Sequence, residues 1–142
     1  MNDTVKLAKE ACRGCKYATE GISIARGYSK SGELSHLLES YEKEHKEIKS
    51  ELSKKIRTLG EDEYNHPKIG AAMTKLHTNV MLTMDSSSKK IAELMINGCN
   101  MGIKSLAKEK NKNRFADKES RELTERLIST EQRMAKDLLA FL

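Results

Sequence analysis

Apolar residues recur every three or four positions along most of this chain, which is the spacing of one face of an α-helix. The pattern predicts long helices from Asn2 or Asp3 to about Tyr28, from Ser31 or Gly32 to Leu59, from about Ser86 to Glu109, and from Asp117 to the end. A shorter stripe predicts a further helix from Pro67 to about Met84. The longest uninterrupted stripe consists of Leu34, Leu38, Tyr41, His45, Ile48, Leu52, Ile56 and Leu59. These periodicities predict an all-α protein.

Residues at the ends of these stripes support the predicted boundaries. Asn2 or Asp3 can cap the first helix, and Asp117 can cap the last one. Gly60 is a favoured residue just past a helix C-terminus, and Pro67 suits the first turn of a new helix. The lysine-rich stretch 108–114 is predicted to be a basic loop between the last two helices.

The lengths of the connections predict how the helices are arranged. The short connection over residues 28–33 makes the first two long helices antiparallel neighbours. The short helix lies in a long crossover that lets the second and third long helices run parallel, as in bundles with one long connection. Residues 1–142 are therefore expected to form one four-helix bundle domain.

Small side chains on two of the predicted helices indicate helix packing. The first helix places Gly14, Ala18 and Gly21 on its inner face, and the third long helix carries Gly98-x-x-x-Gly102. Both patterns predict a close approach of neighbouring helices. Apolar residues make the face of the first helix wide, which suggests a homodimer, although burial of that face within one chain is the preferred interpretation.

The amino-acid composition limits the kinds of molecule that the chain is expected to bind. Hydrophobic residues make up 37% of the 142 residues and charged residues 33%, with no apolar run long enough to span a membrane and no apolar secretion signal. We therefore expect a soluble, cytoplasmic protein without membrane contact. The net charge is +5, but 26 basic residues are interleaved with 21 acidic ones and Trp is absent, so nucleic-acid binding is not expected.

One metal-ligand spacing occurs, Glu42-x-x-His45, in the middle of the longest stripe. On a helix this spacing lets a carboxylate and an imidazole reach one point, as in di-iron bundles. His45 could then bind iron or another first-row transition metal together with Glu42 and with Glu20 or Glu131.

The alternative is that His45 is a core residue. A buried imidazole would then hydrogen-bond Tyr17, Tyr41 or a carboxylate, because an unpartnered buried polar group costs about 1–3 kcal/mol. We prefer this interpretation because an asymmetric ligand set holds a metal ion poorly. It predicts that His45→Leu changes stability by less than about 1.5 kcal/mol.

The chain resembles the ferritin-like superfamily, and within it a bacterial group of ferritin-like bundles described as a domain of unknown function. The resemblance rests on the helix lengths, Leu59-Gly60, Gly70 followed by Leu76-His77, and Ile91-Ala-Glu-Leu followed by Cys99. It implies a ferritin-like four-helix bundle with a short extra helix in the long crossover.

The resemblance also implies where metal ligands would be, because metal-binding members carry Glu-x-x-His twice. This chain has the motif once, and the last helix has Glu131-Gln-Arg-Met134 where the second copy would stand. The third long helix has no inward carboxylate, since Glu93 is expected to point outward. We therefore predict a non-catalytic bundle that acts through protein–protein interaction, without a cofactor. The alternative is a metal-binding or oxidoreductase protein with a partial site at Glu42 and His45.

The three cysteines are Cys12, Cys15 and Cys99, an odd number that argues against a disulfide framework. Cys12-x-x-Cys15 lies in mid-helix, where two thiols are too far apart to bond without distortion. We interpret this pair as small apolar residues with modest redox sensitivity. Phosphate-binding glycine loops and nucleophile motifs are absent from the sequence.

Overall fold

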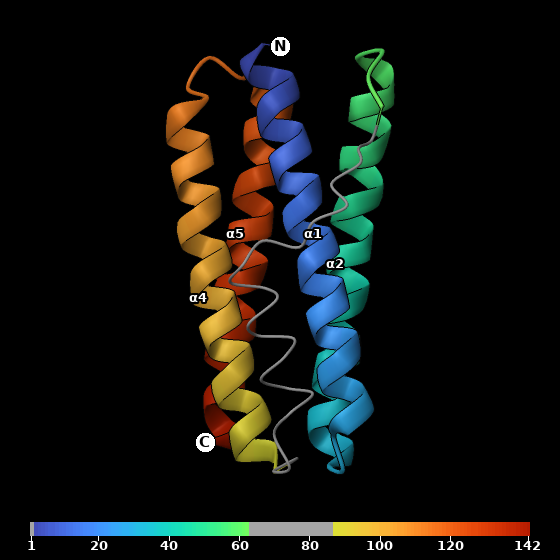
Figure 1. Cartoon of the computed structure of the whole chain (residues 1–142), viewed down its shortest axis with the longest axis vertical. Helices are drawn as coiled ribbons and strands as arrows, with labels where there is room; N and C mark the ends of the chain where they lie inside the picture. The colour runs from blue at the N-terminus through green and yellow to red at the C-terminus, as the bar shows by residue number, and fades with distance from the viewer. Residues whose placement is uncertain (1, 63–86) are drawn as a thin grey trace.

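The computed structural model describes residues 2–62 and 87–142, and within these ranges it is entirely helical. The elements are α1 (Asp3–Tyr28), α2 (Gly32–Thr58), α4 (Ser88–Lys112), α5 (Lys118–Leu138) and a final 3₁₀ turn, η1 (Leu139–Phe141). Figure 1 shows the four α-helices as one elongated bundle. The predicted all-α class is confirmed, whereas the short helix predicted over 67–84 lies outside the described residues.

The main packing in the bundle is between antiparallel helices, although the parallel α1 and α5 also contact each other. α1 packs on α2 and α4, and α5 packs on α4 and α2. In Figure 1, α2 and α4 run in the same direction, while α1 and α5 run in the opposite one. α2 and α4 are joined by residues 59–87, so the parallel arrangement predicted from the long connection is observed.

Side-chain caps fix the helix starts. Oδ1 of Asn2 accepts a hydrogen bond from the backbone N of Val5 (2.9 Å), and Oδ1 of Asp117 accepts one from Ser120 (2.9 Å). Ser31 and Ser87 cap α2 and α4 in the same way. Gly60 follows α2 with φ of +75°, a conformation that favours glycine.

The end of α4 differs from the prediction. The stretch 108–114 is not a loop, because the helix continues to Lys112 and the turn begins at Asn113. Lysine is a good helix former, and its charge is favourable near a helix C-terminus, so these residues extend the helix rather than end it. Asn113 ends it by donating a side-chain hydrogen bond to the carbonyl O of Glu109 (2.9 Å).

The apolar core consists of two clusters separated by a polar layer. The first cluster includes Leu38 and Tyr41 of α2 with Met134 of α5, and the second includes Ile48 of α2 with Leu127 of α5. His45 and Glu131 lie between these residues on their helices, and their exposed fractions are 0% and 5%. The middle of the bundle is therefore polar although it is buried.

The wide face of α1 is covered within the chain. Tyr17 and Ile24 are half-buried, and Tyr28 is the only large apolar side chain of α1 that is exposed. This agrees with the preferred interpretation of that face. In the described ranges, no helix has both the length and the apolar character that crossing a membrane requires.

Candidate functional site

The central feature of the polar layer is a hydrogen-bonded pair formed by His45 of α2 and Glu131 of α5. Nε2 of His45 lies 2.8 Å from Oε1 of Glu131, and Nδ1 lies 2.6 Å from the backbone O of Tyr41. A carbonyl oxygen only accepts hydrogen bonds, so Nδ1 must carry a proton. Both ring nitrogens of His45 are therefore engaged, and one further proton is shared between Nε2 and Glu131.

The surroundings of His45 favour its charged form. Burial on its own would lower the pKa of His45, but the hydrogen bond and the negative charge of Glu131 outweigh it, so the pKa is raised. The raised pKa favours an imidazolium at His45 that donates to Glu131. The prediction that a core His45 would find a carboxylate partner agrees with this geometry, although Tyr41 contributes its backbone carbonyl rather than its hydroxyl.

Glu42 and Glu20 are placed elsewhere. Oε1 of Glu42 accepts hydrogen bonds from Nη1 of Arg26 (2.9 Å) and Nζ of Lys46 (3.2 Å), so it faces a basic pair. Glu20 is half-buried on α1 and has no hydrogen bond or ion pair with any described residue. Of the four predicted ligands, only His45 and Glu131 come together.

This arrangement fits a proton better than a metal ion. Two ligands bonded to one tetrahedral ion at roughly 2.1 Å each would lie about 3.4 Å apart, whereas Nε2 and Oε1 are 2.8 Å apart. Across residues 2–62 and 87–142, no three His, Cys, Asp or Glu side chains are grouped so that they could hold a metal ion. The described residues therefore do not fit the ligand set that the ferritin-like resemblance implies.

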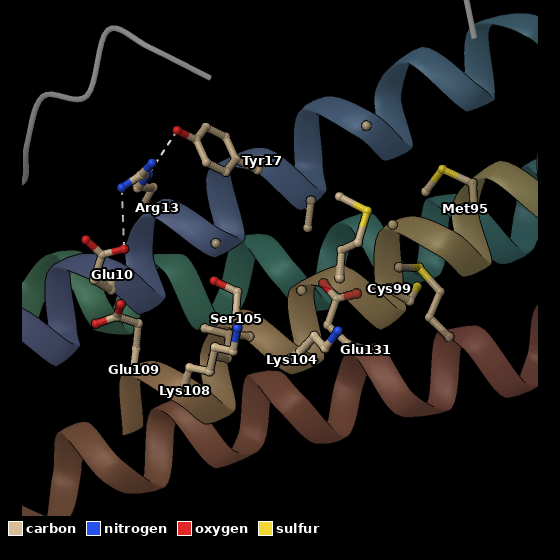
Figure 2. A pocket seen from close by; sticks show the side chains of 18 residues that line it. Glu10, Arg13, Tyr17, Met95, Cys99, Lys104, Ser105, Lys108, Glu109 and Glu131 are labelled. Carbon is tan, nitrogen blue, oxygen red and sulfur yellow. Dashed lines mark hydrogen bonds and ion pairs between the residues drawn. The ribbon is translucent and has the colours of Figure 1, made fainter. Parts of the chain in front are cut away.

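A cavity of about 570 Å³ opens beside this pair, between α1 and α4. Its lining includes small residues from both helices, which are Gly14, Ala18, Gly21, Gly98 and Gly102. A Cβ built on Gly102 would lie 3.7 Å from Cδ of Glu131, so a larger residue there would cover the carboxylate. Figure 2 shows the carboxylate of Glu131 between the two helices.

The small residues were predicted to bring helices together, and this holds only in part. At Gly14 a Cβ would meet Leu106 at 3.4 Å, so α1 and α4 are in close contact there. At Gly102 the missing side chain instead leaves Glu131 open to the cavity. Met101 and Ser105 of α4 also line the cavity and are exposed.

One side of the cavity is polar and comes from both helices (Figure 2). On α1, Nε of Arg13 donates to the hydroxyl of Tyr17 (2.9 Å), and Nη1 of Arg13 lies 3.5 Å from Oε2 of Glu10. On α4, Lys104 and Lys108 are exposed one turn apart, and neither has an ion-pair partner within the described part of the chain.

The three cysteines are buried and form no disulfide with one another, as predicted. Burial raises the pKa of the Cys15 thiol, and burial together with the charge of Glu131 raises the pKa of the Cys99 thiol. Cys99 lines the cavity on the same side as Glu131. Burial and a raised pKa both disfavour a nucleophilic thiolate at Cys15 and Cys99.

Sequence reasoning identified His45 and Glu131 but missed the cavity. The sequence did contain one signal of the cavity: glycines on α1 and α4 lie at the same level of the bundle as the polar core residue Glu131. The chain matches no protein-family model, no curated protein and no solved structure.

Proposed function

We propose that this chain is a ferritin-like bundle that has no metal chemistry and works as a non-catalytic binding protein. The observation that carries the proposal is the His45–Glu131 hydrogen bond at the centre of the bundle. A shared proton holds together two side chains that would otherwise be free to bind a metal. The antiparallel neighbours, and the parallel α2 and α4 joined by a long connection, support the ferritin-like assignment.

The state of three other candidate groups in the described ranges supports a binding role. Cys15 and Cys99 have raised thiol pKa values, and Glu42 is neutralised by Arg26 and Lys46. A role in protein–protein interaction, including a homodimer, stays part of the proposal. The cavity beside Glu131 offers a second way to bind a partner molecule.

A metal-binding function is the alternative, and one observation favours it. Histidine ligands usually donate their second ring N–H to a carbonyl or carboxylate, as Nδ1 of His45 does toward Tyr41. Binding a metal would require Glu131 to move away and Nε2 to lose its proton.

Elemental analysis of protein purified without a metal-affinity tag separates the two functions. We expect less than about a tenth of an equivalent of iron, manganese, zinc or copper per chain, and no change in melting temperature on adding a chelator. At 100-fold saturation a bound metal would stabilise the fold by about 2.7 kcal/mol, so its removal would be visible. A stoichiometric metal that is lost in His45→Gln would establish the alternative.

A further inference from the structure

The floor of the cavity carries a buried carboxylate with unused acceptor capacity. Glu131 is 5% exposed and lines the cavity, with its carboxylate between α1 and α4 in Figure 2. A carboxylate has about four lone-pair sites, of which His45 Nε2 uses one. The remaining sites favour a hydrogen-bond donor, and a charged donor most of all.

The edge of the cavity carries a net positive charge, because Arg13, Lys104 and Lys108 outnumber Glu10 and Glu109. Glu10 is paired with Arg13, and Oε2 of Glu109 accepts a hydrogen bond from Asn113 (3.2 Å). Lys104 and Lys108, by contrast, have no ion-pair partner in the described ranges. An anionic group at the edge of the cavity would therefore be attracted to these two ammonium groups.

Between these polar parts the lining is apolar and adaptable. The three methionines in the described ranges, Met95, Met101 and Met134, all line this cavity. Thioether side chains are flexible and fill space around ligands of varied shape. The volume of about 570 Å³ lies within the range of small-molecule sites.

We propose that this cavity binds a small zwitterion with an apolar middle, whose amine hydrogen-bonds Glu131 and whose anionic group pairs with Lys104 and Lys108. A simple amine would be repelled by the two lysines. A simple anion would place its apolar end against Glu131, whose carboxylate would lose water without gaining a partner. The inference rests on the proposed binding role and specifies the ligand class.

The test compares three probes of the same chain length, 8-aminooctanoate, octanoate and octylamine, by titration calorimetry on the full chain. Methionine methyl NMR reports the location, because Met95 and Met134 are buried and line the cavity. We expect 8-aminooctanoate to bind at one site and to shift both methyl signals. Octanoate and octylamine, which each lack one of the two charged groups, should bind at least about tenfold more weakly than 8-aminooctanoate.

Two variants and a matched control test the roles of the side chains. Glu131→Gln should remove the preference for 8-aminooctanoate over octanoate. The double variant Lys104→Gln with Lys108→Gln should remove the preference for 8-aminooctanoate over octylamine. The control, Lys54→Gln with Lys112→Gln, changes the same charge at two exposed lysines outside the cavity and should leave binding unchanged.

Three results would overturn the inference: equal affinity for all three probes, an unchanged affinity in the Lys104 and Lys108 variant, or no response of the Met95 and Met134 methyl groups. None of these results would affect the proposed absence of metal chemistry, which elemental analysis tests separately. Because the lysine variant alters exposed residues, it tests the inference even if Glu131→Gln fails to fold.

Discussion

Replacing His45 with leucine removes one half of a buried ion pair and leaves the other half in place. His45 is fully buried, and Glu131 is 5% exposed with His45 Nε2 on its Oε1. Removing one partner of a buried pair typically costs about 3–5 kcal/mol, because the remaining charge is desolvated and uncompensated. We therefore predict that His45→Leu destabilises the chain by about that amount at neutral pH, which for a chain of this size lowers the melting temperature on the order of 10 °C.

This value replaces the expectation from sequence alone, which was a change below about 1.5 kcal/mol. That expectation assumed that leucine only fills the volume of the imidazole. The structure identifies Glu131 as the partner of His45. The loss of stability in His45→Leu is therefore expected to come from the Glu131 carboxylate, which stays buried without a partner.

Glu131→Met completes a double-mutant cycle. Alone it leaves Nε2 of His45 without a partner, which costs about 1–3 kcal/mol. Replacing both residues removes the whole pair, so His45→Leu with Glu131→Met should lie within about 1.5 kcal/mol of the parent or be more stable. The coupling energy between the two sites should be roughly 2 kcal/mol or more.

Urea unfolding followed by circular dichroism measures each variant. Glu44→Gln is the matched control, because Glu44 precedes His45 on α2 and pairs with Arg133 of α5 at the surface. Loss of such an exposed pair should cost less than about 1 kcal/mol. Additive effects of the two core substitutions, or a nearly neutral His45→Leu, would refute the reasoning.

Three further predictions concern pH, glycine positions and thiols. The raised pKa of His45 implies stability that is complete below the unfolded-state pKa of about 6.5 and is lost as pH rises through the higher folded value. The advantage of the parent over His45→Leu, measured by urea unfolding, should therefore shrink as pH rises above about 6.5. A constant difference would contradict the charged pair; the other titratable groups whose charges act on the pair are Glu44, Cys15 and Cys99. Gly60→Ala should destabilise by about 1 kcal/mol because of its φ of +75°, whereas Gly27→Ala, with open space around it on α1, should be neutral or stabilising by up to about 1 kcal/mol in the same assay. Iodoacetamide should leave native thiols unmodified and label all three cysteines in urea, as mass spectrometry would show; rapid labelling of Cys15 or Cys99 in the native protein would contradict their burial and raised pKa.

Much of the fold could be predicted from sequence because its determinants are local. Asn2, Ser31 and Asp117 mark helix starts through their own side chains, and Gly60 marks an end through its backbone conformation. The C-terminus of α4 was misjudged because its lysines are equally typical of a polar loop and of the last turns of a helix.

The candidate site was less predictable because it depends on contacts between distant segments. His45 could be placed in the core from its stripe, but its partner is on α5, and helix rotation decides whether Glu131 faces it. Glu42 illustrates the same limit: its spacing from His45 permits a shared ligand, yet the position of Arg26 on α1 determines where the carboxylate points.

The protonation state of His45 tests the central claim most directly. Nitrogen-15 NMR of histidine-labelled protein, with the His45 signals assigned by comparison with His45→Gln, reports whether each ring nitrogen carries a proton. At neutral pH we predict that both Nδ1 and Nε2 are protonated, and that adding one equivalent of zinc leaves them so. An Nε2 without a proton, whose signal shifts when zinc is added, would show that His45 is available as a metal ligand and would contradict the account.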